Sequence, residues 1–173
     1  YVRSTGNMSA LDFGASTDWQ DELMRTAVSH SHNINFSSSK KNHGYRASFT
    51  YHNNEGVIKT NTMNRLAGSL SAYQTGLNGH LRLDEGINTN FDSWHPIDSR
   101  IFERMINLQP TFPVYNSDGT YAQLNGTNTE NPVELNNHRT EDRKRHRFLG
   151  YMKAELQIID GLSATMNTSY EFN

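Results

Sequence analysis

The chain has 173 residues, of which 34% are hydrophobic, and a formal net charge of −2 with both signs interspersed. This balance argues against a nucleic-acid binder driven by bulk electrostatics. Cysteine is absent, which removes disulfides, zinc knuckles and thiol nucleophiles from consideration. The sequence neither starts with Met nor ends on a turn signal, and we expect it to be an internal piece of a longer protein.

The stretch TDWQDELMRTAVSHSHNINFSSS, residues 17–39, changes from helical to alternating spacing. Asp18, Asp21 and Glu22 suit the N-cap and first turn of a short helix, and nothing in the sequence supplies the base, nucleophile or pocket that an acid pair would need for catalysis. His30 and His32 share one face of the strand that follows, a spacing that metal ligands also use. No third ligand accompanies them, and we predict neither a metal site nor a cofactor.

Alternation of apolar and polar residues is the strongest pattern in the rest of the chain. It runs through HSHNINFSSS, YRASFTYH, RLAGSLSAY, HLRLDEGINTNF, RFLGYMKAELQI and LSATMNTSYEFN. This period predicts about six strands, several near the ~9–11 residues of a tilted strand that crosses a bilayer. We expect one face to carry Tyr45, Phe49, Leu66, Leu70, Met152, Leu156 and Ile158. The other face should carry Arg46, Ser48, Ser69, Lys153 and Glu155.

The predicted connections alternate between short and long. KKNHG, TGLNG and the dipeptide DG after Ile159 are turn-forming, whereas NNEGVIKTNT and the stretch 92–142 are long. In a meander this order gathers all short turns at one end and all long loops at the other. Outer-membrane barrels, with tight periplasmic turns and extended extracellular loops, have this asymmetry.

The long stretch 92–142 has recognisable content. A stripe of Ile101, Met105 and Leu108 predicts a helix between Asp98 and Leu108, with Pro110 as a stop. NSDGT resembles the start of a calcium loop but lacks the downstream Glu, so an Asx turn is the better interpretation. Three loop aromatics are candidates for stacking on a sugar or peptide, or else for packing the loop on itself: Trp94, Tyr115 and Tyr121.

The basic run RKRHR, residues 143–147, leads directly into a strand. A nucleic-acid patch is disfavoured by the negative net charge. The alternatives are a solvated strand entry and contact with lipopolysaccharide phosphates through charge-assisted hydrogen bonds from Arg143, Arg145 and Arg147.

Several segments together resemble a known family. They are the 17–39 stretch, YRASFTYHNNEGVIK, RLAGSLSA, LQPTFPVYNSDGTY, NPVEL and RFLGYMKAELQIIDGL. In this order, from about Asp18 to the end, they resemble SusC/RagA-type TonB-dependent outer-membrane transporters. SSSKKN stands where that family more often has a Gly-Gly turn, and RKRHR is heavier in basic residues than usual.

The resemblance implies an all-β antiparallel meander, part of a barrel of about 22 strands with short helices in its extracellular loops. Residues 1–29 would end one extracellular loop, 30–91 would form four strands, 92–142 a long extracellular loop and 143–173 two strands. The plug and most of the barrel would be absent.

The resemblance further implies TonB-dependent import of a large nutrient, an oligosaccharide or peptide, across the outer membrane of a Gram-negative bacterium. The partners would be a SusD-like surface lipoprotein, the TonB complex and outer-membrane lipid, in an arrangement compatible with a dimer of transporter–lipoprotein pairs. The alternative is a secreted soluble β-sandwich that binds a ligand, with its apolar face buried under a second sheet. An enzyme such as a glycan hydrolase would need a carboxylate pair that the sequence does not offer.

Overall fold

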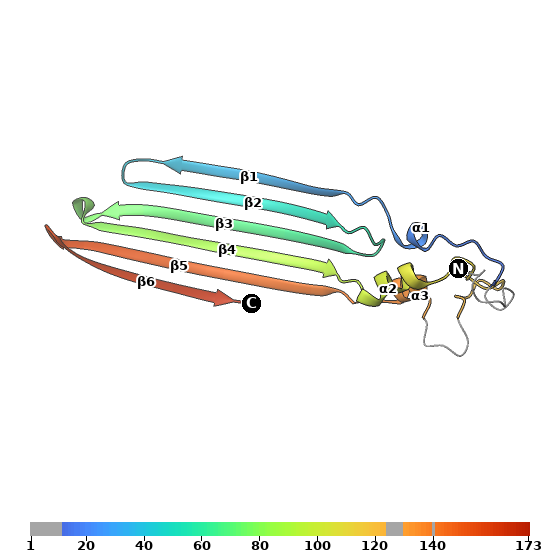
Figure 1. Cartoon of the computed structure of the whole chain (residues 1–173). Coiled ribbons are helices and arrows are strands. Elements are labelled where there is room, and N and C mark those ends of the chain that lie inside the picture. The colour runs from blue at the N-terminus through green and yellow to red at the C-terminus, as the bar shows by residue number, and fades with distance from the viewer. Residues whose placement is uncertain (1–11, 124–129, 140) are drawn as a thin grey trace. The chain divides into compact units, whose positions relative to one another are not determined.

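The computed structural model describes residues 12–123, 130–139 and 141–173 (Figure 1). The chain falls into two compact units. The sheet unit comprises 29–54, 63–94 and 143–173, and the loop unit comprises 1–28, 55–62 and 95–142. Residues 1–11 of the predicted first loop and 124–129 of the predicted long loop lie outside the described residues.

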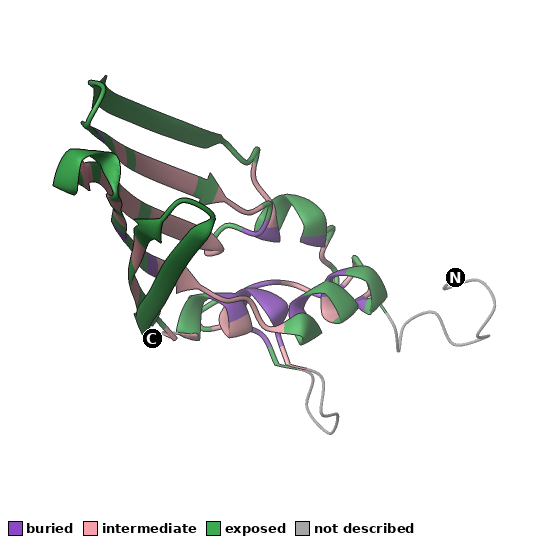
Figure 2. Cartoon of the chain, turned by 90° about the vertical axis from the view of Figure 1, so that its left-hand side faces the viewer, coloured by how far each residue is buried: buried purple, intermediate pink, exposed green. Residues whose placement is uncertain are grey.

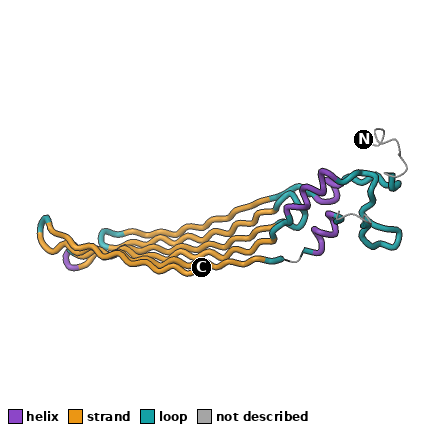
Figure 3. Tube along the Cα trace, turned by 60° about the horizontal axis from the view of Figure 1, so that its bottom comes forward, coloured by secondary structure: helices purple, strands orange, loops and turns teal. Residues whose placement is uncertain are grey.

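The sheet unit is a single six-stranded sheet whose strands follow one another in chain order (Figure 1). Figure 3 shows these strands running alongside one another. The first two strands pair antiparallel, as do the fourth with the fifth and the fifth with the sixth, so the prediction of an all-β antiparallel meander is confirmed. The strands are β1 Ser29–Ser39, β2 His43–Glu55, β3 Thr62–Gly76, β4 Leu81–His95, β5 Arg143–Ile159 and β6 Leu162–Phe172.

The connections between these strands alternate in length, as the sequence predicted. Short turns join β1 to β2, β3 to β4 and β5 to β6. The second turn uses positive φ at Leu77 and Asn78, and the third at Gly161, where a glycine adopts this conformation without strain. The longer connections, 56–61 and 96–142, belong to the loop unit.

The sheet has one apolar and one polar face, because alternate residues point to opposite sides. The apolar face is fixed by cross-strand partners such as Ile34 with Phe49 and Ala154 with Met166. Every member of the predicted apolar set is exposed, with fractions between 37% for Met152 and 52% for Tyr45 and Ile158. A second sheet packed over this face would bury them. In the described residues all six strands lie in one sheet with this face exposed, an arrangement that the sandwich alternative does not predict.

Two glycines on the polar face lie directly under tyrosine rings of neighbouring strands. A Cβ atom at Gly44 would come within 2.5 Å of the Tyr73 ring, and one at Gly86 within 2.5 Å of the Tyr151 ring. Tyr151 is the direct cross-strand partner of Gly86. These aromatic rings therefore cover backbone that glycine leaves bare, and a larger residue at either position would displace a ring.

The loop unit packs three short helices around its own core: α1 Trp19–Leu23, α2 Ser99–Asn107 and α3 Pro132–His138. Helix α2 lies where the apolar stripe predicted it, and Asp98 caps it by accepting a hydrogen bond from the Arg100 amide. The buried apolar residues are Trp19, Leu23, Ile58, Ile101, Met105, Leu108, Phe112, Val114, Ala122 and Val133. None of the helices in the described residues is long and apolar enough to cross a membrane.

Asn131 joins helix α3 to the rest of this core. Its side-chain oxygen accepts a hydrogen bond from the Val133 amide at 3.0 Å, and its Nδ2 donates to the carbonyls of Val114 at 2.8 Å and Ala122 at 3.1 Å. The residue is 1% exposed. Asn131 thus serves as the N-cap of α3 and as the hydrogen-bond donor for two buried carbonyls of the preceding segment.

Two features differ from the sequence expectation. Helix α3 was not predicted, although an Asn N-cap followed by Pro at the first helical position is a known start signal. Trp94 was expected in a loop and lies in β4, which continues to His95. The apolar alternation ends near Phe91, but Asp92 and Trp94 still pair with Arg145 and Arg143 across the ladder, so polar cross-strand partners extend the strand.

Candidate ligand-contact sites

A buried carboxylate organises the polar face where β3, β4 and β5 lie side by side. Asp92 Oδ1 accepts a hydrogen bond from Arg65 Nε at 2.7 Å, and its Oδ2 accepts one from Arg145 Nη2 at 2.8 Å. Further bonds from Arg65 Nη2 and Arg145 Nε, at 3.3 Å and 3.2 Å, make both guanidinium groups two-pronged. The Asp92 side chain is only 4% exposed, while those of Arg65 and Arg145 are 41% and 56% exposed.

Trp94 belongs to the same cluster, which is one of the results that sequence reasoning missed. The Arg145 guanidinium carbon lies 5.6 Å from the centroid of the Trp94 ring, within cation–π range. The three side chains share one face of the sheet, because Trp94 is two residues after Asp92 and Arg145 is the direct cross-strand partner of Asp92. We call Arg65, Asp92, Arg145 and Trp94 the Asp92 cluster.

The basic run divides between the two faces of β5. Arg143, Arg145 and Arg147 point to the polar face, and Arg147 pairs with Glu171 at 2.7 Å. Lys144 and His146 point to the apolar face, where the His146 ring stacks on Phe91 with centroids 4.0 Å apart. Contact of the three arginines with lipopolysaccharide stays a prediction. The register makes Lys144 and His146 the basic side chains of the run that share a face with the exposed apolar residues.

Tyr115 and Tyr121, the other predicted contact residues, form a pair in the loop unit. They are bridge partners with ring centroids 5.2 Å apart. Asn137 donates a hydrogen bond to the Tyr121 hydroxyl at 3.0 Å, and the His138 ring meets Tyr121 edge-on. Tyr115 is 48% exposed, and partial burial raises the pKa of its hydroxyl. Tyr115 therefore exposes part of its ring to solvent, while Tyr121 is held in place by Asn137 and His138.

The turn before Tyr121 closes as the sequence predicted. Asp118 Oδ1 accepts hydrogen bonds from the Thr120 amide at 3.0 Å and from its hydroxyl at 2.6 Å. These bonds lower the pKa of Asp118. The NSDGT segment is thus an Asx-type turn that supports the tyrosine pair.

A charged hollow of about 520 Å³ in the loop unit was not predicted. At its edge Asp98 pairs with Arg100 at 2.8 Å and with Arg139 at 3.1 Å, and Arg100 also reaches Glu130 at 2.6 Å. The hydrogen bonds from Arg100 lower the pKa of Asp98 to about 2. The opposite charges here compensate each other, and they tie the start of α2 to the region of α3.

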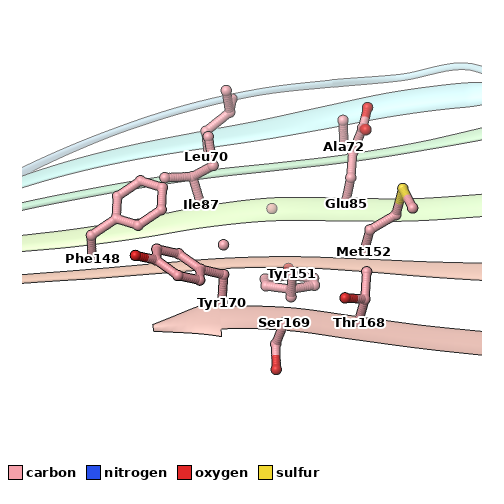
Figure 4. Close-up of a pocket in the computed structure, with 12 residues that line it drawn as sticks. Leu70, Ala72, Glu85, Ile87, Phe148, Tyr151, Met152, Thr168, Ser169 and Tyr170 are labelled. Atoms are coloured by element: carbon pink, nitrogen blue, oxygen red, sulfur yellow. The ribbon is translucent and has the colours of Figure 1, made fainter. Parts of the chain in front are cut away.

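The apolar face carries a shallow hollow of about 550 Å³ across β3 to β6 (Figure 4). It lies around Gly150, where the missing side chain leaves space between Phe148, Ile87 and Tyr170. Glu85 is the one acidic residue in its lining. A hollow of this kind has no second carboxylate or base for catalysis and is suited to an apolar neighbour.

The two histidine rings on β1 pack against each other in a tilted arrangement. The His30 and His32 rings are 5.2 Å apart, and His30 also meets Tyr51 at 5.8 Å. In the part of the chain that the structure describes, no group of three or more His, Cys, Asp or Glu residues is placed to hold a metal ion.

Comparison with known proteins gives the following similarities; no protein-family profile matches the chain. The TonB-dependent receptor SusC of Bacteroides thetaiotaomicron is 30% identical over 125 residues, which are 70% of this chain and 12% of the receptor. The TonB-dependent receptor P3 of Formosa agariphila is 25% identical over 169 residues, 92% of this chain and 17% of the receptor. The chain thus spans less than a fifth of the length of either relative.

Solved structures have the same fold. A chain of the RagAB peptide transporter superposes with a TM-score of 0.75 at 18% identity, over 93% of this chain and 19% of that chain. The RagAB peptide importer in its closed-closed state gives a TM-score of 0.74 at the same identity.

A sheet of long antiparallel strands with one exposed apolar face, aligned with part of these transporters, is a segment of a β-barrel wall. The predicted resemblance is confirmed in sequence and in fold. The chain corresponds to part of the barrel of TonB-dependent receptors of the SusC/RagA type.

Proposed function

We propose that the chain forms part of a receptor that imports a large nutrient across the outer membrane, driven by TonB. The sequence match to SusC over 70% of the chain is the observation that carries this proposal. The nutrient would be an oligosaccharide or a peptide. The protein would bind and translocate it without covalent chemistry, in keeping with relatives that are named receptors rather than enzymes.

The sheet unit supports a place in the barrel wall. Its apolar face is exposed, and the outer strands β1 and β6 are exposed along their whole length (Figure 2). Strands of this length with an unpaired edge attract further strands. A barrel supplies such neighbours on both sides and turns the apolar face to lipid and the polar face to the lumen.

In this arrangement residues 30–91 and 143–173 cross the membrane, whereas residues 1–29 and 92–142 face the cell exterior. The loop unit, which gathers the longer connections, would then meet nutrient and a SusD-like lipoprotein that covers the receptor. The exposed Tyr115 surface and the Trp94 ring are proposed to touch one of these two. Two receptor–lipoprotein pairs would form the dimer.

A test uses the receptor that contains this chain, expressed in its bacterial host. Cells are given a fluorescently labelled oligosaccharide mixture or peptide mixture, and uptake is compared with that of a strain lacking the receptor. We expect the receptor to fractionate with the outer membrane and uptake to stop when the proton-motive force that energises TonB is collapsed. Recovery of the receptor in the soluble fraction, or uptake equal in both strains, would contradict the proposal.

A further inference from the structure

The Asp92 cluster has a charge that its own members do not balance. Two guanidinium groups share one carboxylate, which leaves one positive charge. Both arginines bond to Asp92 through Nε and Nη2. Each guanidinium has five N–H donors in a fixed fork, so both present further donors at the exposed side of the cluster.

Asp92 holds these donors in place. Because its carboxylate is almost fully buried and bonded to both arginines, each side chain is fixed by two hydrogen bonds before any ligand arrives. Fixing a long side chain in advance removes part of the ordering cost of binding. The Trp94 ring against Arg145 adds a flat apolar surface beside the charge.

From this geometry we infer that the Asp92 cluster is a subsite for a carboxylate group of the imported nutrient. The inference rests on the proposed function, which makes the polar face the wall of the passage. Arg65 and Arg145 would donate paired N–H bonds to the carboxylate, since the guanidinium fork matches its two oxygens. The Trp94 ring would contact the adjoining sugar ring or peptide. Both an acidic peptide and a uronic-acid oligosaccharide carry the required group.

The experiment measures binding to the intact receptor purified in detergent. The probes are a tetra-glutamate peptide and its tetra-glutamine counterpart, and an oligouronate and the same oligosaccharide with its carboxyl groups reduced. We expect one acidic probe to bind more tightly than its neutral counterpart, and R145Q or R65Q to weaken that acidic probe by about tenfold. The affinity of the neutral probes should be the same in the parental receptor and in both variants. Whichever acidic probe binds, the peptide or the oligouronate, identifies the source of the carboxylate.

Arg82 offers a matched control on the same face. It makes a two-pronged pair with Asp84, at 2.9 Å and 2.8 Å, and lies 5.2 Å from the Tyr73 ring centroid. Because it pairs with Asp84 one to one, R82Q should leave the acidic preference unchanged. The two cluster variants change different strands and leave one arginine on Asp92, so loss of preference in both is not explained by a misfolded strand.

Equal binding of acidic and neutral probes by the parental receptor, or an unchanged preference in R145Q and R65Q, would overturn the subsite. These results are distinct from failure of the proposed function, which shows as an absence of energised uptake for every nutrient mixture. A receptor that imports nutrient but shows no acidic preference refutes only the subsite.

Discussion

Replacing Asn131 by Ala tests whether the loop unit is held together by a single buried side chain. The substitution removes the N-cap of α3 and the donors to the Val114 and Ala122 carbonyls. A lost cap costs about 1 kcal/mol, and each buried carbonyl left without a partner costs about 1 kcal/mol at the low end of the known range. The expected loss of local stability is therefore about 3 kcal/mol.

Amide hydrogen exchange in the intact receptor measures this loss where it occurs. A change of about 3 kcal/mol raises the opening equilibrium by about a hundredfold, so amides of α3 and of residues 112–122 should exchange faster by about that factor. Amides of the sheet unit should not change, because its strands carry their own ladder of hydrogen bonds.

The matched control is Asn137→Ala on the same helix. Asn137 is exposed and its described side-chain bond is one hydrogen bond to the Tyr121 hydroxyl, so its loss should cost about 0.5–1 kcal/mol. If the Asn131 and Asn137 variants exchange at the same rate in α3, the reasoning about buried carbonyls is wrong.

Four further results are expected. Replacing Trp94 or Tyr115 by Ala should weaken nutrient binding by about 1–3 kcal/mol if the ring is a binding hot spot, and import at the parental rate with normal surface levels would refute the ligand role. Gly86→Ala should displace the Tyr151 ring, because the added Cβ would lie 2.5 Å from the far end of that side chain, and an unchanged NMR signal of the Tyr151 ring in detergent would contradict this contact. The chain expressed alone should aggregate without detergent, and a soluble monomer with a cooperative melt would contradict this. The pKa of Asp98 falls from 3.8 to about 2 on folding. Its contribution to the stability of the loop unit is therefore present above about pH 4 and is lost as the pH drops through 2. Amide hydrogen exchange of the loop unit, measured as the pH is lowered, would detect this loss.

The strands could be predicted because alternation is a local property of the sequence. Each of the six segments shows period two by itself, and the observed sheet keeps the same chain order. Helix α2 could be predicted for a similar reason, since its cap at Asp98 and its buried Ile101 and Met105 lie within one short stretch. Helix α3 is harder to see because it is polar along most of its length, and its cap Asn131 bonds to residues far back in the chain.

The Asp92 cluster could not be predicted from local pattern, because it unites side chains from three strands. Asp92 and Arg65 are 27 residues apart, and Asp92 and Arg145 are 53 apart. Only the register of β4 on β5 brings the second pair together. In the sequence, Asp92 marks the end of an apolar pattern, whereas in the sheet it is the most buried charged group on the polar face.

The faces of the basic run, residues 143–147, follow from residue spacing once the extent of β5 is known. Met152 was assigned to the apolar face from the alternation, and Arg145 is seven residues before it. An odd separation places two residues of an unbroken strand on opposite faces, so the arginines of the run had to point away from the apolar side once β5 was known to start at Arg143. The alternating pattern begins only at Arg147, and the basic run before it was interpreted as the entry to a strand. Because β5 is continuous, its register decides both assignments. Lys144 and His146 lie on the apolar face, where lipid headgroups would contact them in a barrel. Arg145 lies on the polar face and is bonded to Asp92, where it would contact a carboxylate of the nutrient.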